Sequence, residues 1–180
     1  MGRKESRIQS WTSRFLLTIF IIFTTQNLIS SPVDDHQERF EDVALKIWEY
    51  AELGYLEEKS SGLLQQELED SGFTIQSGIA GIPTAFIAEY NNGGPILGIL
   101  GEFDALPGLS QQNVPFKTAE GLSSANGHAC GHHLFGAASA WAVVAIKEWL
   151  EESGTSGTIR FYGTPAEEGG SGKVYIARDG

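Results

Sequence analysis

The sequence of 180 residues lacks a second cysteine, since Cys130 is the only one. A lone cysteine cannot form a disulfide within the chain, so a disulfide framework is excluded. Basic residues are also scarce, with 12 against 23 acidic residues and a formal net charge of -11 at pH 7. From Asp34 onward the imbalance grows to 8 basic against 22 acidic residues. We therefore expect no nucleic-acid partner, because phosphate backbones are bound by basic surfaces.

Long apolar runs are missing too. An apolar stretch at residues 15–23 is far shorter than the ~20 residues that a helix needs to cross a bilayer. It follows four basic residues and precedes polar and small residues that end near Pro32. This layout predicts a secretory signal over residues 1–33. A permanent N-terminal anchor, or an upstream region read through from a misplaced start codon, would explain the same segment.

The expected location depends on that segment. A true signal would export the protein to the periplasm, the extracellular space or the secretory pathway, and otherwise we expect it in the cytoplasm. A stable membrane partner is expected only if the segment is retained. The chain as a whole is 41% hydrophobic and 19% charged, which is ordinary for a globular protein and predicts one domain over residues 34–180.

Two helices are expected at the start of this domain. Residues 34–53 carry apolar side chains at helical spacing, which predicts a helix that packs on the core through Phe40, Val43, Ala44, Ile47 and Ala51. Residues 57–71 repeat the pattern more weakly, and Gly72 is a plausible stop. Next, residues 84–90 and 95–103 are apolar runs separated by Asn-Asn-Gly-Gly, which predicts a β-hairpin.

The second half alternates strand and helix. We expect a strand at residues 96–101, a helix at about 132–152 and a strand at 158–163, which together form a βαβ unit with parallel strands. The helix is expected to face the core through an apolar stripe of Leu134, Ala138, Trp141, Ala145 and Trp149. The fold class is therefore α/β.

Three polar segments should meet at one edge of this sheet. In a βαβ unit the helix begins on the side where the first strand ends, and both parallel strands end on that side. Residues 102–104, 128–133 and 165–170 occupy these positions. Because ligands of open α/β sheets bind outside the carboxyl ends of strands, we expect the functional site there.

The residue types in these segments are those of a metal site. Thiolate, imidazole and carboxylate groups are suitable ligands for zinc. Manganese and cobalt overlap with zinc in ligand preference, so the residue types do not identify the metal. We expect Cys130 and His132 to be ligands, with the cation and nearby helix amides lowering the pKa of the thiol. One of the adjacent Glu167 and Glu168 can bind the ion while the other acts as general base. Asp104 could bind directly or orient a histidine ligand, and the sequence leaves both open.

Three ordered motifs carry a family resemblance. They are GEFDALPG at residues 101–108, GHACGHH at 127–133 and TPAEEGGSGK at 164–173. With them, the chain from about Phe40 to Gly180 resembles the amidohydrolase branch of metallopeptidase family 20, which includes aminoacylase-like enzymes and p-aminobenzoyl-glutamate hydrolases. Within this branch the chain resembles the p-aminobenzoyl-glutamate hydrolases most. The resemblance implies a zinc-exopeptidase-like mixed sheet flanked by helices, with the catalytic domain incomplete in this chain.

The resemblance also implies roles for individual residues. Cys130, His132 and Glu168 are implied as metal ligands and Glu167 as the general base, with Asp104 beside the metal. Where the peptidases of the family have a histidine ligand ahead of this aspartate, the chain has Glu102, as members of the amidohydrolase branch also lack that histidine. His128 is expected to support the site without binding the ion, and His133 has no assigned role.

Family members are considerably longer, with further histidine ligands and a dimerisation domain downstream. The resemblance therefore implies a fragment, two divalent ions per site in the full-length protein, and a homodimer of that form. We expect the 180-residue chain alone to be weakly active or inactive. The leading function is hydrolysis, by metal-activated water, of a small-molecule amide that joins an acyl or aroyl group to an amino acid. The alternatives are a cysteine-dependent thiol hydrolase and a truncated, non-catalytic protein that binds a metal and a carboxylate.

Overall fold

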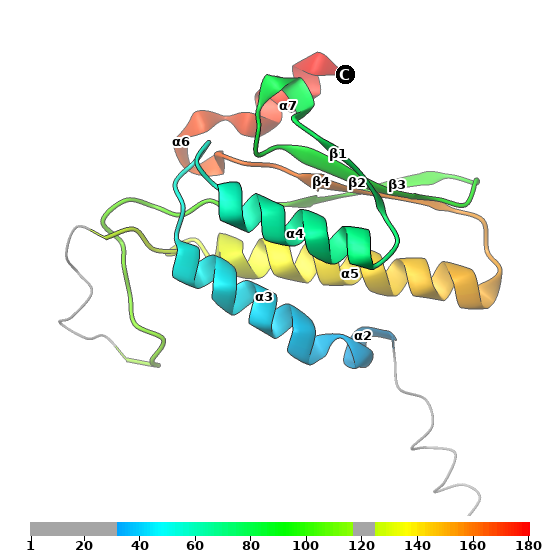
Figure 1. The fold of residues 1–180 in the computed structure, drawn as a ribbon, viewed down its shortest axis with the longest axis horizontal. Helices are drawn as coiled ribbons and strands as arrows, with labels where there is room; N and C mark the ends of the chain where they lie inside the picture. Colours follow the sequence, from blue (N-terminus) through cyan, green and yellow to red (C-terminus); the bar gives the residue numbers. More distant parts are fainter. Residues whose placement is uncertain (1–31, 117–124) are drawn as a thin grey trace, which may run out of the picture. The chain divides into compact units, whose positions relative to one another are not determined.

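The computed structural model describes residues 32–116 and 125–180 (Figure 1). Residues 1–31, which hold nearly all of the predicted signal, lie outside the described residues. The chain divides after Asp35, so the short helix α2 (Pro32–Asp35) is separate from the unit that begins at His36. Within the described ranges, no helix combines the length and the hydropathy that a bilayer crossing requires.

A mixed sheet organises the second unit. Its strands are β1 (Thr74–Ser77), β2 (Phe86–Asn91), β3 (Ile96–Gly101) and β4 (Thr158–Gly163), in the spatial order β1-β2-β4-β3. The pairs β1-β2 and β2-β4 are antiparallel, whereas β3 and β4 are parallel. The predicted α/β class with a mixed sheet is confirmed.

The βαβ unit is also confirmed. Strand β3 leads through helix α5 (His132–Ser153) to β4, and the two strands are in register from Ile96 opposite Thr158 to Gly101 opposite Gly163. Because the strands are parallel and of equal length, they end at the same edge. That edge is also where α5 begins (Figure 1).

The predicted hairpin is wrong, because β2 and β3 are not neighbours and β4 lies between them. Residue Thr158 of β4 lies opposite Asn91 of β2 on one side and opposite Ile96 of β3 on the other. The turn between β2 and β3 spans the width of the inserted strand. At Gly94 a Cβ would lie 2.5 Å from the carbonyl oxygen of Ser156, so this turn packs directly on the loop that enters β4.

Three long helices lie on one side of the sheet (Figure 1). Helices α4 (Glu58–Asp70) and α5 contact the strands, and α3 (Gln37–Tyr50) packs on α4 and α5. Helices are thereby confirmed within the predicted ranges 34–53 and 57–71, and Phe40, Val43, Ala44 and Ile47 are buried as expected. Ala51 was wrongly placed on the same face, because α3 ends at Tyr50 and Ala51 is only partly buried. Among the described residues, the second unit also contains three short helical segments, namely η1 (Ile79–Gly81), α6 (Glu167–Gly170) and α7 (Gly172–Asp179).

The predicted apolar face of α5 is wrong in part. Leu134 and Trp149 are 58% and 53% exposed, and Ala138 is exposed as well. The buried face consists mainly of small residues, namely Gly136, Ala137, Ser139, Ala140, Val143, Val144 and Ala145. Where α5 passes the end of β3, at Gly136, the helix lies so close that a side chain would not fit. A Cβ at Gly136 would lie 2.6 Å from the carbonyl oxygen of Glu102.

Aromatic rings fill the space between the sheet and the helices. Phe86, Phe103 and Phe161 are each at most 1% exposed, and the ring centroids of Phe86 and Phe161 are 5.6 Å apart. Burial of one such side chain stabilises a fold by roughly 1.5–3 kcal/mol. This core fixes the ends of β3 and β4, from which the polar segments continue.

Candidate metal centre

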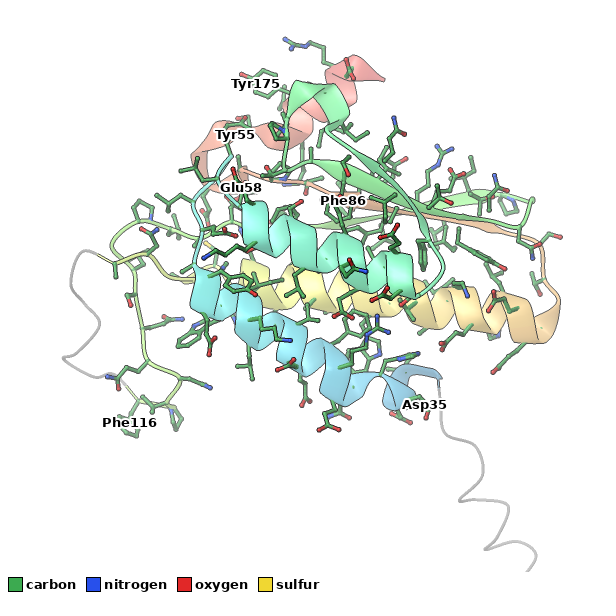
Figure 2. All side chains as sticks on the ribbon, viewed as in Figure 1. Asp35, Tyr55, Glu58, Phe86, Phe116 and Tyr175 are labelled. Carbon is green, nitrogen blue, oxygen red and sulfur yellow. The ribbon has the colours of Figure 1, made fainter. Side chains whose placement is uncertain are left out.

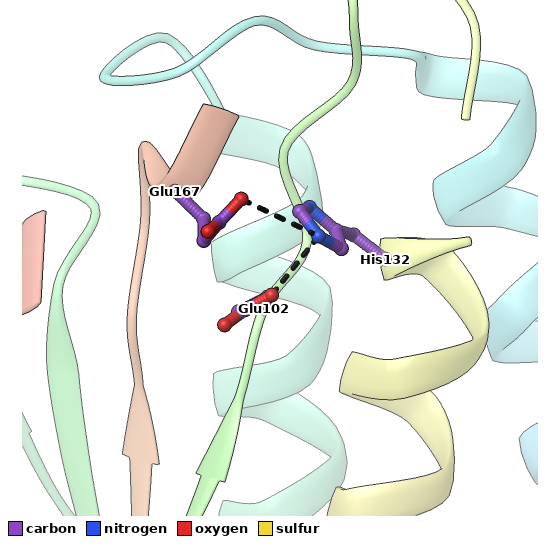
Figure 3. Close-up of side chains that lie close together, drawn as sticks. All are labelled: Glu102, His132 and Glu167. Atoms are coloured by element: carbon purple, nitrogen blue, oxygen red, sulfur yellow. Dashed lines mark ion pairs between the residues drawn. The ribbon is translucent and has the colours of Figure 1, made fainter. Parts of the chain in front are cut away.

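Three segments converge beyond the carboxyl ends of β3 and β4, as the topology predicted. Glu102 follows β3 directly, His132 is the first residue of α5, and Glu167 is the first residue of α6 after β4. Figure 3 shows the three side chains pointing toward one another from these elements. One ligand atom from each lies within 4.8 Å of the others, which is a spacing that could hold a metal ion.

His132 lies at the centre of this site and is 7% exposed. Its Nδ1 is 2.9 Å from Oδ1 of Asp104 and 3.1 Å from the carbonyl oxygen of the same residue. On the other side of the ring, Nε2 is 2.9 Å from Oε2 of Glu102 and 3.8 Å from Oε2 of Glu167. The imidazole is therefore held between carboxylates on both sides.

Asp104 connects two of the converging segments. Its Oδ1 bonds His132, and its Oδ2 accepts a hydrogen bond of 2.9 Å from the backbone N–H of Glu168. Burial alone would raise the pKa of Asp104, but the hydrogen bonds from His132 and from Glu168 outweigh it and hold the pKa below its ordinary value. The hydrogen bond to Asp104 likewise raises the pKa of His132. This geometry favours the orienting role, because Asp104 fixes Nδ1 and leaves Nε2 toward Glu102 and Glu167.

Glu102 takes a larger part in the site than the sequence suggested. It is 9% exposed, and its second oxygen forms an ion pair with Lys173 of α7. The sequence placed Glu102 in one of the converging segments and at the position of a missing histidine, but assigned it no role in the site. The available signal was its spacing: Glu102 and Asp104 are two residues apart at the end of a strand, so both side chains can reach one partner.

Glu168 lies on the Nδ1 side of His132, and Cys130 is its hydrogen-bond partner. Cys130 is exposed and is not one of the three residues in the cluster described above, which has Glu102 and Glu167 in place of Cys130 and Glu168. A hydrogen bond to Glu168, followed by burial, raises the pKa of the thiol. This direction is opposite to the expected lowering, since that expectation assumed the positive charge of a bound ion. With carboxylates alone as neighbours, the thiolate is disfavoured.

The donor atoms of this site fit a divalent cation. Oε1 of Glu168 is buried without a hydrogen-bond partner and lies 3.8 Å from Nδ1 of His132. Four carboxylates, those of Glu102, Asp104, Glu167 and Glu168, surround one imidazole, and the ion pair with Lys173 offsets one negative charge. Such crowding is costly unless a cation shares the site. Thiol, imidazole and carboxylate donors are those that zinc-class ions prefer.

Two further histidines lie next to this centre. His128 is 2% exposed, and its Nε2 is 3.0 Å from the carbonyl oxygen of Ile47, to which it can donate. Burial lowers the pKa of His128. The ring of His133 lies 5.0 Å from that of His128, and burial together with the neighbouring imidazoles lowers the pKa of His133 to about 4. The contact of His128 with α3 suits the supporting role expected from the sequence, which stays a prediction.

Comparisons with known proteins bear on this arrangement. Residues 98–180 match the family described as Peptidase family M20/M25/M40. One subunit of the p-aminobenzoyl-glutamate hydrolase of Escherichia coli (strain K12) is 43% identical over 152 residues, which cover 84% of this chain and 32% of that protein. Hippurate hydrolase of Campylobacter jejuni is 29% identical over 146 residues, which cover 81% of this chain and 36% of that protein.

A solved structure is similar as well. The Bacillus subtilis YXEP protein, described as a dinuclear metal binding peptidase from the M20 family, has a TM-score of 0.66 at 26% sequence identity. The match covers 79% of this chain and 38% of that chain. The present chain thus spans about a third of the length of the curated relatives it matches.

Proposed function

Since this chain belongs to peptidase family M20/M25/M40, we propose that it supplies part of the active site of a metal-dependent hydrolase. The substrate is a small molecule in which an amide joins an acyl or aroyl group to an amino acid. The observation that carries this proposal is the placement of His132, which lies between Asp104 on one side and Glu102 with Glu167 on the other. The arrangement provides metal donors and a nearby free carboxylate.

The names of two relatives support the substrate class. One belongs to a p-aminobenzoyl-glutamate hydrolase and the other is a hippurate hydrolase, and hippurate is itself benzoyl-glycine. Both names therefore describe an aroyl group in amide linkage to an amino acid. For this chain we propose the same linkage, with p-aminobenzoyl-glutamate as the first substrate to test.

We propose Cys130, His132 and Glu168 as ligands, with zinc, manganese or cobalt as the ion and two ions in the complete protein. When bound, such an ion polarises the scissile carbonyl and makes a nearby water molecule more acidic. Asp104 accepts a hydrogen bond from Nδ1 of His132 and so keeps the ring in one orientation. With Nδ1 held by Asp104, Nε2 faces a second possible ligand set, Glu102, His132 and Glu167, which shares only the histidine. Binding by Cys130 and Glu168 through the same nitrogen would require these two side chains to turn toward Nε2.

Glu167 handles the protons in this proposal. It is exposed, unlike Glu102 and Asp104, so a water molecule and a substrate can reach its carboxylate. Glu167 takes a proton from the attacking water and then gives a proton to the departing amine nitrogen. The amide bond breaks as the amine leaves, and the acyl or aroyl group is released as a carboxylate.

Catalysis by Cys130 as a nucleophile receives less support. Attack requires a thiolate, and the neighbouring Glu168 raises the pKa of this thiol. Treatment with a chelator, followed separately by thiol alkylation, decides between the two chemistries. If activity survives removal of the metal and is lost on alkylation, the metal mechanism is wrong.

The function is tested by hydrolysis of p-aminobenzoyl-glutamate after loading with zinc, manganese or cobalt. We expect clear turnover from a polypeptide extended to the length of the curated relatives and little from the 180-residue chain. Absence of turnover of any N-acyl or N-aroyl amino acid by the extended, metal-loaded polypeptide would contradict the proposal. Comparable turnover by the two forms would contradict only the expectation for the shorter chain. Export and assembly into a homodimer stay predictions.

A further inference from the structure

A buried carboxylate outside the metal centre holds the loop that carries Glu167 and Glu168. Glu57, which immediately precedes α4, is 0% exposed. Its Oε1 accepts a hydrogen bond of 2.8 Å from the backbone N–H of Ala166, and its Oε2 accepts one of 3.0 Å from Oγ1 of Thr84. Burial raises the pKa of Glu57. A buried carboxylate is costly and is retained where its hydrogen bonds serve a purpose.

The partner of Glu57 has an unusual backbone. Ala166 has φ 56° and ψ 46°, which is the left-handed helical region, and it is 1% exposed. A residue with a side chain costs about 1–2 kcal/mol in this region, and it stays there only when its surroundings hold it. Ala166 directly precedes Glu167, so its conformation sets the direction in which the chain enters α6.

The residues just before Glu57 hold the same loop from one side. Gly54 lies so close to Ala166 that a Cβ on it would be 2.9 Å from both Cα and Cβ of that alanine. The hydroxyl of Tyr55 donates a hydrogen bond to the carbonyl oxygen of Gly170, at the end of α6. Figure 2 shows Tyr55 beside this C-terminal part of the chain. Residues 54–57, which we name the clasp, thus contact the loop at both of its ends.

The loop held by the clasp carries the two glutamates of the site. Its backbone N–H at Glu168 donates to Asp104, and the carboxylate of Glu167 lies 3.8 Å from Nε2 of His132. Both contacts depend on the direction of the chain after Ala166. A small rotation at this residue would move the two carboxylates away from the imidazole together.

We propose that Glu57 is a positioning residue that holds the Ala166 turn and thereby places Glu167 and Glu168 at the metal centre. This inference rests on the proposed function. Glu57 acts as a hydrogen-bond acceptor and takes no part in proton transfer. A glutamine at this position keeps an acceptor oxygen, whereas an alanine leaves the N–H of Ala166 buried without a partner.

The test compares Glu57→Ala with Glu57→Gln in the extended, zinc-loaded polypeptide. Three quantities are measured: zinc affinity by competition with a chromophoric chelator, kcat and KM for p-aminobenzoyl-glutamate, and Tm without metal. For Glu57→Ala we expect a loss of ~10- to 100-fold in both zinc affinity and kcat, with a much smaller change in KM, as for residues that orient metal ligands. Glu57→Gln should restore both quantities to within about threefold of the unmodified protein.

Glu52→Ala is the matched control. The Glu52 carboxylate accepts hydrogen bonds from the backbone N–H groups of Lys59 and Ser60 and from Oγ of Ser60, at the start of α4. Its loss should lower Tm through the lost helix cap and leave zinc affinity and kcat unchanged. Should Glu57→Ala fail to fold, Gly54→Ala presses on Ala166 from the same clasp, and we expect it to lower zinc affinity and kcat in the same manner.

Two outcomes overturn the inference. In the first, Glu57→Ala lowers Tm as Glu52→Ala does but keeps zinc affinity and kcat. In the second, Glu57→Gln is as impaired as Glu57→Ala, so that an acceptor oxygen is not what the site requires. If the unmodified extended polypeptide neither binds zinc nor hydrolyses the substrate, the proposed function itself fails and the inference fails with it.

Discussion

The core beneath the sheet and the metal centre at its edge are built from the same elements, yet they use opposite chemistry. Phe103 packs in the core, while its two neighbours in sequence, Glu102 and Asp104, both contact His132. In the core, burial is favourable by itself. At the centre, burial of carboxylates is unfavourable and must be offset by hydrogen bonds, an ion pair or a cation. The difference shows that a stable apolar anchor such as Phe103 can hold crowded charges in place.

This contrast predicts that substitutions in the core lower stability, whereas substitutions at the metal centre lower activity or metal affinity. The largest effect is expected on kcat, from substitution of Glu167. Glu167→Gln should lower kcat by about 10²- to 10⁴-fold because the proton acceptor is lost, while bound zinc stays at the level of the unmodified protein. Steady-state assays and metal analysis of the extended polypeptide check this. Glu152→Gln makes the same change at an exposed position near the end of α5 and should be neutral. Normal hydrolysis by Glu167→Gln would remove Glu167 from its role.

In the core, Phe161→Ala should lower the free energy of unfolding by about 3–5 kcal/mol, because it leaves a cavity against Phe86. Urea unfolding of the metal-free protein measures this loss. Tyr162→Ala is the control, since Tyr162 is the next residue of β4 and is only half-buried. We expect it to lose less than half as much. Equal losses would mean that the two faces of β4 do not differ as the structure indicates.

At the centre, Cys130→Ser should weaken zinc binding by about 100-fold, because a hydroxyl is a much poorer ligand than a thiolate. Glu102→Gln should change zinc affinity less, since Lys173 already shares this carboxylate. Chelator competition measures both. A greater loss for Glu102→Gln than for Cys130→Ser would assign the ion to the second set of ligands, Glu102, His132 and Glu167.

The smallest effect is expected from Glu57→Gln on stability. The pKa of Glu57 is raised in the folded protein, so folding favours its protonated form. Its stabilising contribution is present below the unfolded pKa and is lost as pH rises through the folded pKa. Glutamine resembles the protonated form, and the variant should therefore raise the metal-free Tm by a few degrees at pH 7 and by less near pH 4. A Tm difference that does not depend on pH would contradict this explanation.

Much of the fold could be predicted because it depends on local pattern and connectivity. Apolar spacing identified α3 through residues such as Phe40 and Ile47, and the alternation of strand, helix and strand placed His132 at the same edge as Glu102. The family resemblance stated from the three motifs is confirmed by the match over residues 98–180 and by the E. coli relative.

The errors concern contacts between distant parts of the chain. The β2-β3 hairpin was expected because its turn residues are favourable, but β4, about 65 residues further on, competes for both strands. The face of α5 was misjudged because large apolar side chains were preferred, whereas close contact with the sheet selects Gly136 and Ala140. Glu57 was missed because its burial depends on Ala166 and Thr84, which are distant in sequence.

The short distance between α5 and β3 depends on two residues that lack a Cβ, Gly101 and Gly136. At Gly101 a Cβ would lie 3.4 Å from Cα of Gly136 and 2.4 Å from the ring of Phe161, and at Gly136 it would meet the carbonyl of Glu102. His132 lies one helical turn before Gly136, so this spacing also sets how far the imidazole stands from its carboxylates. Two glycines without any functional group thus help to determine the distances within the charged centre.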